Sequence, residues 1–559
     1  MVKRITNLLY KEFSGLHEAA FLLGGFAILS QILALLRDRL FAHSFGAGST
    51  LDMYYAAFRI PDFLYVSLAS FVSVTVLIPF LVKKLESGDE AANKFLNNVF
   101  TVFFISIIAA SAVLFIFIPQ LSQFIFPGFP GDMQETLVTI TRILLLSPIL
   151  LGLSNLAGSI TQSFRKFFVY ALSPVLYNLG IIAGVIFLYP IFGIPGLVYG
   201  VVLGALLHLA IQLPVLAKYG FIPRPTFKIN WSEIRKVVAL SLPRTLGLSI
   251  HQISLIVLAS LASVMAVGSI AIFNLSFNLQ SVPLAIIGVS YSVAAFPTLA
   301  KLFSENNTVR FISYVSIAAR HIIFWSFPIM ALFIVLRAQI VRTILGSGAF
   351  DWSDTRLTAA TLAFFAISLV AQGLILLFVR AFYAAGDTKT PVFVNVGSAI
   401  FIIMSAYFFV FVFEHYDSFR YFMEALLRIT DIEGTVVTML ALAYSLGMVV
   451  NAVLLGILFR RHFGKTSLSI YKTFVHSFSA AVFMGFVAYQ SLYVFGLVLD
   501  TDTFLGIFLQ GLFSGILGIV AGVFLLRFMG NTEIVEIWKS LHSKFWKTKS
   551  VIAPEKEEL

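Results

Sequence analysis

The chain has 559 residues, of which 59% are hydrophobic and only 12% are charged, and its mean hydropathy is +0.95. A soluble globular protein carries about 25% charged residues, so this chain cannot cover a water-facing surface of its own size. Because the sequence contains no cysteine, disulfides, thiol nucleophiles, iron–sulfur clusters and thiolate zinc sites are excluded. The composition therefore predicts an all-α polytopic membrane protein.

Polar and Gly/Pro-rich breaks divide the chain into fourteen apolar segments, each long enough to cross a bilayer as a helix. The predicted spans run over 18–44, 52–82, 95–126, 134–163, 167–189, 195–217, 237–265, 269–300, 311–342, 356–384, 391–413, 434–459, 473–497 and 503–527.

The distribution of basic residues predicts the orientation. Most of the 38 lysines and arginines fall in the loops and tails that are cytoplasmic if the N-terminus is inside. The net charge of +11 is then an effect of the positive-inside rule, and nucleic-acid binding is not expected. Residues 1–11 are polar and basic and indicate a retained cytoplasmic tail rather than a signal peptide. Both termini are predicted to be cytoplasmic.

The chain also resembles itself at a spacing of about 218 residues. The matching pairs begin at Gln31 and Gln252, at Pro79 and Pro297, and at Pro174 and Pro391. Since six spans separate the members of each pair, the repeat predicts two six-helix lobes in the same orientation, related by a pseudo-two-fold axis along the membrane normal.

The predicted domains follow from this repeat. They are an N-terminal lobe (1–217), a cytoplasmic linker (218–236), a second lobe (237–461), two further helices (462–530) and a cytoplasmic tail (531–559). Two parallel lobes around a cleft are typical of a transporter that works by alternating access, and the alternative is a duplicated scaffold that moves nothing. Because no G-x-x-x-x-G-K-[ST] motif occurs, ATP hydrolysis on this chain is not expected.

Ionisable residues inside the predicted spans are concentrated in the first two. They are Arg37, Asp38, Arg39, Asp52, Arg59 and Asp62. Each such group costs at least ~2.5 kcal/mol on insertion scales and therefore needs a reason to be there. Arg37 and Asp38 are adjacent in the chain, so we expect that they cannot share a helix face and need not neutralise each other. Surplus guanidinium groups suit a phosphate-bearing substrate, because they bind phosphate oxygens in pairs.

Polar groups in the other predicted spans are more consistent with structural roles than with substrate binding. For Arg142, Arg244 and Arg320, the sequence favours paired structural charges over substrate ligands. The seventh and eighth spans carry amides, among them Asn274 and Asn278, and no acidic residue. Since no cluster of His, Asp and Glu has metal-ligand spacing, neither a metal nor a cofactor is expected.

Three motifs, in this order, resemble a known family. The first is Leu35-Leu36-Arg37-Asp38-Arg39 with Phe45-Gly46-Ala47-Gly48, Asp52 and Ala57-Phe58-Arg59-Ile60-Pro61; the second is Gly348-Ala349-Phe350-Asp351 with Thr355; the third is Arg380-Ala381-Phe382-Tyr383-Ala384-Ala385-Gly386-Asp387-Thr388-Lys389-Thr390-Pro391. Together with fourteen spans, these motifs resemble the MurJ/MviN lipid II flippases of the multidrug/oligosaccharidyl-lipid/polysaccharide exporter superfamily.

The resemblance implies a flippase that moves lipid II, an undecaprenyl-diphosphate-linked peptidoglycan precursor, from the inner to the outer leaflet of the bacterial cytoplasmic membrane. It places Arg37, Asp38, Asp52, Arg59 and Asn278 at the substrate-binding cavity, with Arg37 as the diphosphate ligand. It also implies that the last two helices form a groove for the polyprenyl tail. A monomeric transporter, rather than an enzyme, is expected, with lipid II and membrane lipids as its partners.

In the third motif, the resemblance implies a conformational role for Arg380, Asp387, Lys389 and Pro391.

The chain departs from the family pattern where the family usually has arginine, at Gln31, Tyr65 and Asn278. A related exporter of another polyprenyl-linked glycan or of a drug-like solute is therefore the alternative. A membrane-embedded enzyme is less favoured, since the longest outer loop, 415–433, is too short to bind a large donor.

Overall fold

The computed structural model describes residues 16–72, 74–464 and 469–536. The predicted tail at 1–11 and most of the predicted tail at 531–559 lie outside these residues. Within the described ranges every regular element is a helix, and there is no strand. The all-α prediction is confirmed.

The helices follow one another in three stretches. The first stretch comprises α2 (Leu16–Phe45), α3 (Ser49–Ala57), α4 (Arg59–Ala69), η1 (Ser70–Val72), α5 (Val74–Glu86), α6 (Asp89–Ile125), α7 (Gly131–Leu144), α8 (Leu146–Ser163), α9 (Phe167–Ala183), η2 (Gly184–Leu188), α10 (Tyr189–Phe192), α11 (Ile194–Ala210) and α12 (Leu213–Tyr219). The second comprises α13 (Trp231–Ser263), α14 (Ser269–Leu284), η3 (Ala285–Val289), α15 (Ser290–Ser304), α16 (Thr308–Val335) and α17 (Arg337–Ile344). The third comprises α18 (Trp352–Ile367), α19 (Leu369–Ala384), α20 (Lys389–His415), α21 (Asp417–Leu427), α22 (Val437–Phe463), α23 (Ser469–Gly496) and α24 (Phe504–Phe528).

Eleven described segments are long and apolar enough to cross a membrane, and α18 with α19, bent by 43° at their junction, makes a twelfth. These segments coincide with the third to fourteenth predicted spans. The first two predicted spans are also helical, but α2 carries the charged triplet that begins at Arg37, and the second is divided into α3, α4, η1 and α5. The chain is a multi-pass membrane protein, and the count of fourteen crossings stays a prediction.

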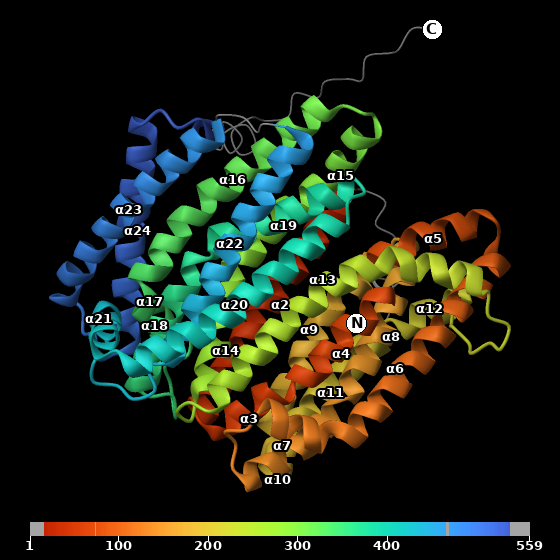
Figure 1. The fold of residues 1–559 in the computed structure, drawn as a ribbon, viewed down its shortest axis with the longest axis horizontal. Helices are drawn as coiled ribbons and strands as arrows, with labels where there is room; N and C mark the ends of the chain where they lie inside the picture. The colour runs from red at the N-terminus through yellow and green to blue at the C-terminus, as the bar shows by residue number, and fades with distance from the viewer. Residues whose placement is uncertain (1–15, 73, 465–468, 537–559) are drawn as a thin grey trace, which may run out of the picture. The chain divides into compact units, whose positions relative to one another are not determined.

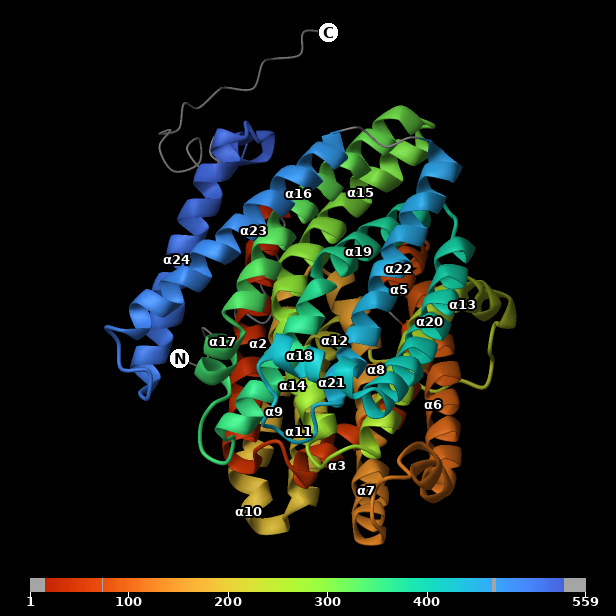
Figure 2. The same ribbon diagram turned by 60° about the vertical axis from the view of Figure 1, so that its left-hand side comes forward.

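The chain forms two compact units, each assembled from separate stretches. Unit 1 is drawn from Met1–Val282, Val341–Phe365 and Gly386–Leu454, and unit 2 from Pro283–Ile340, Ala366–Ala385 and Leu455–Leu559. Unit 1 therefore contains the predicted N-terminal lobe together with parts of the predicted second lobe. In unit 1, α3, α7 and α10 lie at the same end in both views (Figure 1 and Figure 2). In unit 2, α23 and α24 lie side by side and α16 packs on α23 (Figure 2).

Glycines bring two helices of unit 1 into backbone contact. Gly180 and Gly184 face Gly200 and Gly204 of α11, and the spacing of four residues places each pair on one helix face. A Cβ atom on Gly200 would lie 2.4 Å from the Cα of Gly184. Small-xxx-small contacts of this kind hold helices together in lipid, where the hydrophobic effect cannot.

Arg142 of α7 completes a hydrogen bond that a proline removes. Pro119 lies inside α6 and has no N–H to donate to the carbonyl of Phe115, four residues earlier. Arg142 Nε donates to that carbonyl at 3.1 Å, and its guanidinium carbon lies 4.6 Å from the centre of the Phe115 ring. The partner of Arg142 is thus a backbone carbonyl and an aromatic ring, where the sequence favoured a paired charge.

Arg320 of α16 is likewise paired, with a residue of the segment that follows α24. Its Nε donates to Glu533 Oε1 at 2.6 Å, and the hydroxyl of Thr473 in α23 donates to the same oxygen at 2.6 Å. Burial of Glu533 disfavours its carboxylate form, but these hydrogen bonds outweigh that effect and lower its pKa. The predicted cytoplasmic tail thus begins with a segment that is anchored on the helices of unit 2.

Because α9 and α11 are in backbone contact, we expect a single added methyl group at this contact to destabilise the protein. Gly200→Ala should lower the free energy of unfolding by about 1–3 kcal/mol, because the new Cβ forces the helices apart. Thermal unfolding of the purified protein in detergent measures this. Gly397→Ala is the control, since a Cβ there meets nothing within 4 Å, and an equal loss in both variants would contradict the close contact.

Because Arg142 bonds to the carbonyl that Pro119 leaves free, we expect Pro119→Ala to reduce the stability lost on replacing Arg142. Arg142→Leu should cost about 1–3 kcal/mol, because it leaves a carbonyl in a membrane span without a donor. In a Pro119→Ala background the new N–H at position 119 satisfies that carbonyl, so the same Arg142→Leu change should cost much less. A double-mutant cycle of unfolding temperatures tests this. Equal losses in both backgrounds would show that Arg142 acts in some other way.

Candidate functional site

Arg37 of α2 lies at the centre of a polar cluster in unit 1. Its Nε and Nη2 donate to Asp38 Oδ1 at 3.0 and 2.8 Å, and its Nη1 donates to Asn178 Oδ1 of α9 at 3.3 Å. The expectation that Arg37 and Asp38 cannot share a face was wrong, because their side chains form an ion pair. Although adjacent Cβ atoms diverge on a helix, the arginine side chain is long enough to turn its guanidinium back onto the neighbouring carboxylate.

Asn178 is held so that its oxygen faces Arg37. Its amide nitrogen donates to the Ser30 hydroxyl at 3.2 Å and to the Pro174 carbonyl at 3.1 Å. The bonds to Asp38 and Asn178 use three of the five N–H groups of the Arg37 guanidinium, and the Arg37 side chain remains 19% exposed. The guanidinium is therefore oriented by protein groups and still has donors for a further anion.

Asp38 connects α2 to α14. Its second oxygen, Oδ2, accepts a hydrogen bond from the Asn278 amide at 3.1 Å, and the Asp38 side chain is buried. Asn278, predicted as a site residue, is thus in the same cluster as Arg37 and Asp38.

Asp52 of α3 binds the N-terminus of α14. Its Oδ2 accepts from the backbone N–H of Gly268 at 2.6 Å, and its Oδ1 accepts from that of Ala271 at 2.8 Å. Free N–H groups and the helix dipole both favour a carboxylate at this end of α14. Gly268 has a φ of +91°, and a Cβ there would lie 2.0 Å from the carbonyl oxygen of Ala47, so only glycine fits.

Arg59 of α4 is the third charged residue to reach α14. Its Nη2 donates to Asn274 Oδ1 at 2.7 Å, and Asn274 is itself held by a bond from its amide to the Ile270 carbonyl at 2.7 Å. The Arg59 side chain is buried. A neutral amide is therefore the direct partner of this intramembrane cation.

The contacts of α14 share one face. Ala271, Asn274 and Asn278 are three and four residues apart, a spacing that aligns them along one side of a helix. The sequence predicted Asn278 as a site residue but missed Asn178 and Asn274. The only signal for those two was an amide side chain in an otherwise apolar span.

The second sequence motif packs against the first. The backbone N–H of Ala349 donates to the His43 carbonyl at 2.9 Å, and Asp354 Oδ2 accepts from the N–H of Ala47 at 3.0 Å. Gly348, with a φ of +59°, lies so close to His43 that a Cβ would be 2.3 Å from its carbonyl oxygen. The segment that joins α2 to α3 is therefore clamped from two sides, by residues near 268 and by residues near 349.

The third motif makes helix-end contacts. Asp387 Oδ1 accepts from the N–H groups of Lys389 and Thr390, both at 3.0 Å, which caps the start of α20. Pro391 is buried in the first turn of that helix, while the Lys389 side chain is exposed.

Arg380, from the same motif, makes its hydrogen bonds within unit 2. It donates to the Ser292 hydroxyl and to the carbonyl of Val289, the last residue of the π-helical turn η3, the latter at 3.3 Å.

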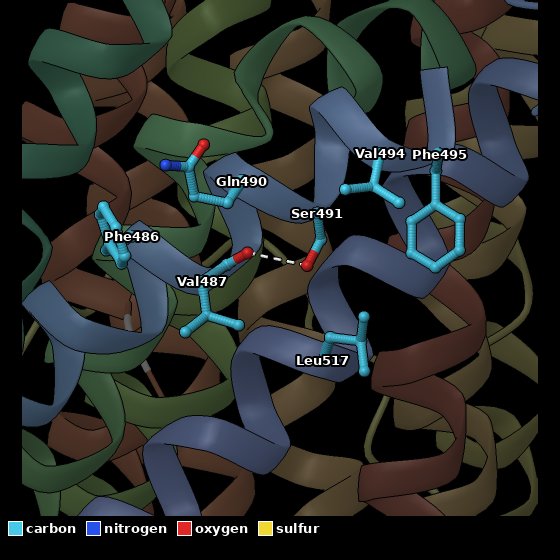
Figure 3. A pocket seen from close by; sticks show the side chains of 7 residues that line it. All are labelled: Phe486, Val487, Gln490, Ser491, Val494, Phe495 and Leu517. Atoms are coloured by element: carbon cyan, nitrogen blue, oxygen red, sulfur yellow. Dashed lines mark hydrogen bonds between the residues drawn. The ribbon is translucent and has the colours of Figure 1, made fainter. Parts of the chain in front are cut away.

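An apolar cavity lies between α23 and α24, with a volume of about 250 Å³ (Figure 3). The Ser491 hydroxyl donates to the Val487 carbonyl at 2.8 Å and so offers little polarity to the cavity (Figure 3). The lining residues are Phe486, Val487, Gln490, Ser491, Val494, Phe495 and Leu517.

Metal-ligand clusters are absent from the part of the chain that the structure describes, because no three His, Asp or Glu side chains gather there.

Comparisons with known proteins agree with one family. The family model described as lipid II flippase MurJ matches residues 41–510. The lipid II flippase MurJ of Burkholderia cenocepacia is 28% identical over 404 residues, which cover 71% of this chain and 78% of that protein. The probable lipid II flippase MurJ of Rickettsia prowazekii is 28% identical over 388 residues, covering 69% of this chain and 76% of that protein.

Solved structures show the same fold. The structure titled lipid II flippase MurJ, inward closed conformation, aligns with a TM-score of 0.71 at 23% identity, over 91% of this chain and 99% of that one. An inward-facing multidrug resistance transporter of the MATE family, in the MOP superfamily, aligns with a TM-score of 0.62 at 17% identity, over 79% and 96%. The resemblance inferred from the three motifs is confirmed, and this chain belongs to the lipid II flippase MurJ family.

Proposed function

We propose that this chain moves lipid II from the inner to the outer leaflet of the bacterial cytoplasmic membrane by alternating access. The observation that carries the proposal is the family match together with an oriented, partly exposed intramembrane guanidinium at Arg37. In this proposal the chain crosses the membrane fourteen times with both termini in the cytoplasm. The two six-helix lobes move against each other, and the protein works as a monomer.

Arg37 is the proposed ligand of the substrate diphosphate. Phosphate oxygens bind guanidinium groups more strongly than neutral groups do, because charge and fork geometry both match. Asp38 holds Arg37 in place in the state described and occupies two of its donors. A diphosphate would compete with Asp38 for those donors, so substrate binding would loosen the link from Asp38 to Asn278 on α14.

The bonds to α14 are the proposed latch of the alternating cycle. Asp38, Asp52 and Arg59 come from the predicted N-terminal lobe, and α14 belongs to the second predicted lobe. With an inside N-terminus, the segment 46–48 that joins α2 to α3 lies at the outer side. The described arrangement would then close the outer opening, and release of substrate would require these bonds to break.

The cavity between α23 and α24 is the proposed place for part of the polyprenyl tail. Its lining is almost wholly apolar, and several lining side chains are exposed at the surface that would face lipid. An isoprenoid chain could enter from the bilayer without leaving an apolar environment.

A second candidate is export of another polyprenyl-linked glycan or of a drug-like solute. Two of the three positions where the family pattern has arginine carry neutral groups that are already bonded. The Tyr65 hydroxyl accepts from the Asn155 amide at 2.9 Å, and the Asn278 amide donates to Asp38. A cavity with fewer cations would tolerate a headgroup of different charge, while Arg37 would still select a diphosphate.

Replacing Arg37 tests the proposed ligand. Arg37→Ala should reduce translocation of fluorescent lipid II in proteoliposomes at least tenfold, because the diphosphate loses its charged donor. Asn178→Ala should have a smaller effect, since it only frees the orientation of Arg37. Expression and unfolding temperature serve as controls for folding. Translocation at the unsubstituted level by a folded Arg37→Ala protein would remove Arg37 from the site.

Complementation separates the two candidate cargoes. The unsubstituted gene should rescue a strain depleted of its own lipid II flippase if lipid II is the substrate. Failure to rescue, despite good expression and membrane insertion, would favour the second candidate.

Filling the α23–α24 cavity tests the place of the tail. Leu517→Trp should slow translocation of the full-length polyprenyl substrate several-fold, because the indole occupies the cavity, and should affect a short-chain analogue less. Val520→Trp on the same helix is the control, since Val520 is exposed and does not line the cavity. Equal effects of Leu517→Trp on both chain lengths would contradict the proposed groove.

A further inference from the structure

The helix α21 carries an unusual exposed face. It follows α20 directly (Figure 2), and its sequence is amphipathic across its short length. Tyr421, Phe422 and Leu426, together with Tyr416 just before the helix, are between 57% and 60% exposed. At 100° per residue, Phe422 and Leu426 project from adjacent turns of one side. Four large apolar or aromatic side chains in such a small area are unfavourable in water.

The opposite side of α21 is fixed by packing. Leu427 is buried, and the buried Glu424 accepts a hydrogen bond from the Thr435 hydroxyl at 2.7 Å. Phe419, one turn before Phe422 on α21, also packs on α20, with its ring stacked 6.5 Å from Phe409 and edge-on at 6.4 Å to Phe413. The helix therefore cannot turn its aromatic face inward without losing these contacts.

The loop after α21 is also tied down. Arg356 of α18 donates to both carboxylate oxygens of Asp431, at 2.8 and 2.6 Å, and to the Arg428 carbonyl at 2.5 Å. The same bond from Arg356 lowers the pKa of the exposed Asp431 carboxyl, so the pair stays charged at neutral pH. Because the packed side of α21 and the loop that follows it are both held in place, the exposed side of α21 is a fixed surface.

The exposed face of α21 continues a surface that must face lipid. The helix α20 is long and apolar enough to cross a membrane. Its exposed side chains include Met404, Phe408 and Phe411, which lead toward its C-terminal end at His415. The aromatic face of α21 begins one residue later, at Tyr416.

The charged groups of α21 lie away from Phe422 and Leu426. Asp417 and Arg420 form an ion pair at 3.3 Å, and the guanidinium carbon of Arg420 lies 5.0 Å from the centre of the Tyr421 ring. By helical geometry, Asp417 is about half a turn from Leu426, and Tyr421 is between them. This order of charge, tyrosine and then Phe/Leu matches the change from water through headgroups to acyl chains at a bilayer surface.

We propose that α21 is an interfacial helix whose Phe422–Leu426 face lies in the headgroup region of the bilayer, with phospholipid as its partner. Tyr421 occupies the level of the headgroups, and Asp417 and Arg420 face water. In the topology proposed above this is the outer leaflet. Interfacial helices are recognised by this combination of an apolar face and a charged flank. The helix fixes the depth of the connection between α20 and α22.

The absence of native cysteine makes a direct test possible. Single-cysteine variants Phe422→Cys and Leu426→Cys are labelled with a nitroxide and reconstituted into phosphatidylethanolamine/phosphatidylglycerol vesicles. Collision rates with oxygen, which concentrates in lipid, and with a water-soluble nickel chelate report the depth of each label. Met404→Cys gives the reference for hydrocarbon, and Glu433→Cys, in the exposed loop, gives the reference for water.

Labels at 422 and 426 should collide with oxygen several-fold more often than with nickel, with a depth between those at 404 and 433. Labels as accessible to nickel as the label at 433 would place the face in water and overturn the proposal. Labels accessible to neither reagent would show that protein covers the face, as in contact with a second copy, and would overturn it too. The measurement does not depend on transport, so its outcome is independent of the cargo.

Discussion

A charged side chain within a membrane needs a partner, and this requirement organises the centre of unit 1. Asp38, Asp52 and Arg59 come from the first helices of the chain, and each finds its partner on α14. The partners on α14 are two side-chain amides and a helix N-terminus, and Asp38 has an ion partner as well, Arg37 of its own helix. Amide and backbone dipoles stabilise a buried charge without adding a second ion that would itself need to be desolvated.

The same rule governs the backbone. A proline within a span leaves a carbonyl group without its helical donor, and an arginine side chain can supply the missing bond. Arg142 serves Phe115 where Pro119 cannot, and Arg380 reaches the Val289 carbonyl at the end of η3. In lipid no water can take over this function, so an arginine there satisfies the structure before it is free for a substrate. Arg142 and Arg380 donate to backbone carbonyls, whereas Arg37 donates to the side chains of Asp38 and Asn178.

These two uses of charge explain how a binding site and a conformational latch can share residues. Asp38 contacts Arg37 with one oxygen and Asn278 with the other. An anion that binds Arg37 would weaken the hydrogen bonds from Arg37 to Asp38. Because Asp38 also bonds to Asn278, this change would reach α14. The neutral amide at position 278 makes this coupling depend on one hydrogen bond rather than on an ion pair, which would be stronger in a low-dielectric surrounding.

Composition and the placement of charge in the sequence established the membrane environment, the helical class, the boundaries of most spans and the positions of Arg37, Asp38, Asp52 and Arg59 as groups that need an explanation. These features are local: the period of apolar residues and the cost of a charge in lipid depend on the chain alone. The family followed from short motifs at fixed places, two of which meet in space around His43 and Ala349.

Only the tertiary structure decided which polar groups meet. Asn178 and Asn274 are ordinary amides in the sequence, and nothing local shows that each faces an arginine from a segment more than a hundred residues away. The pairing of Arg37 with Asp38 was missed because Cβ directions on a helix do not describe where a long, flexible side chain ends. Partners across the bundle depend on helix packing at distances of a few ångströms, and a linear pattern contains no information at that scale.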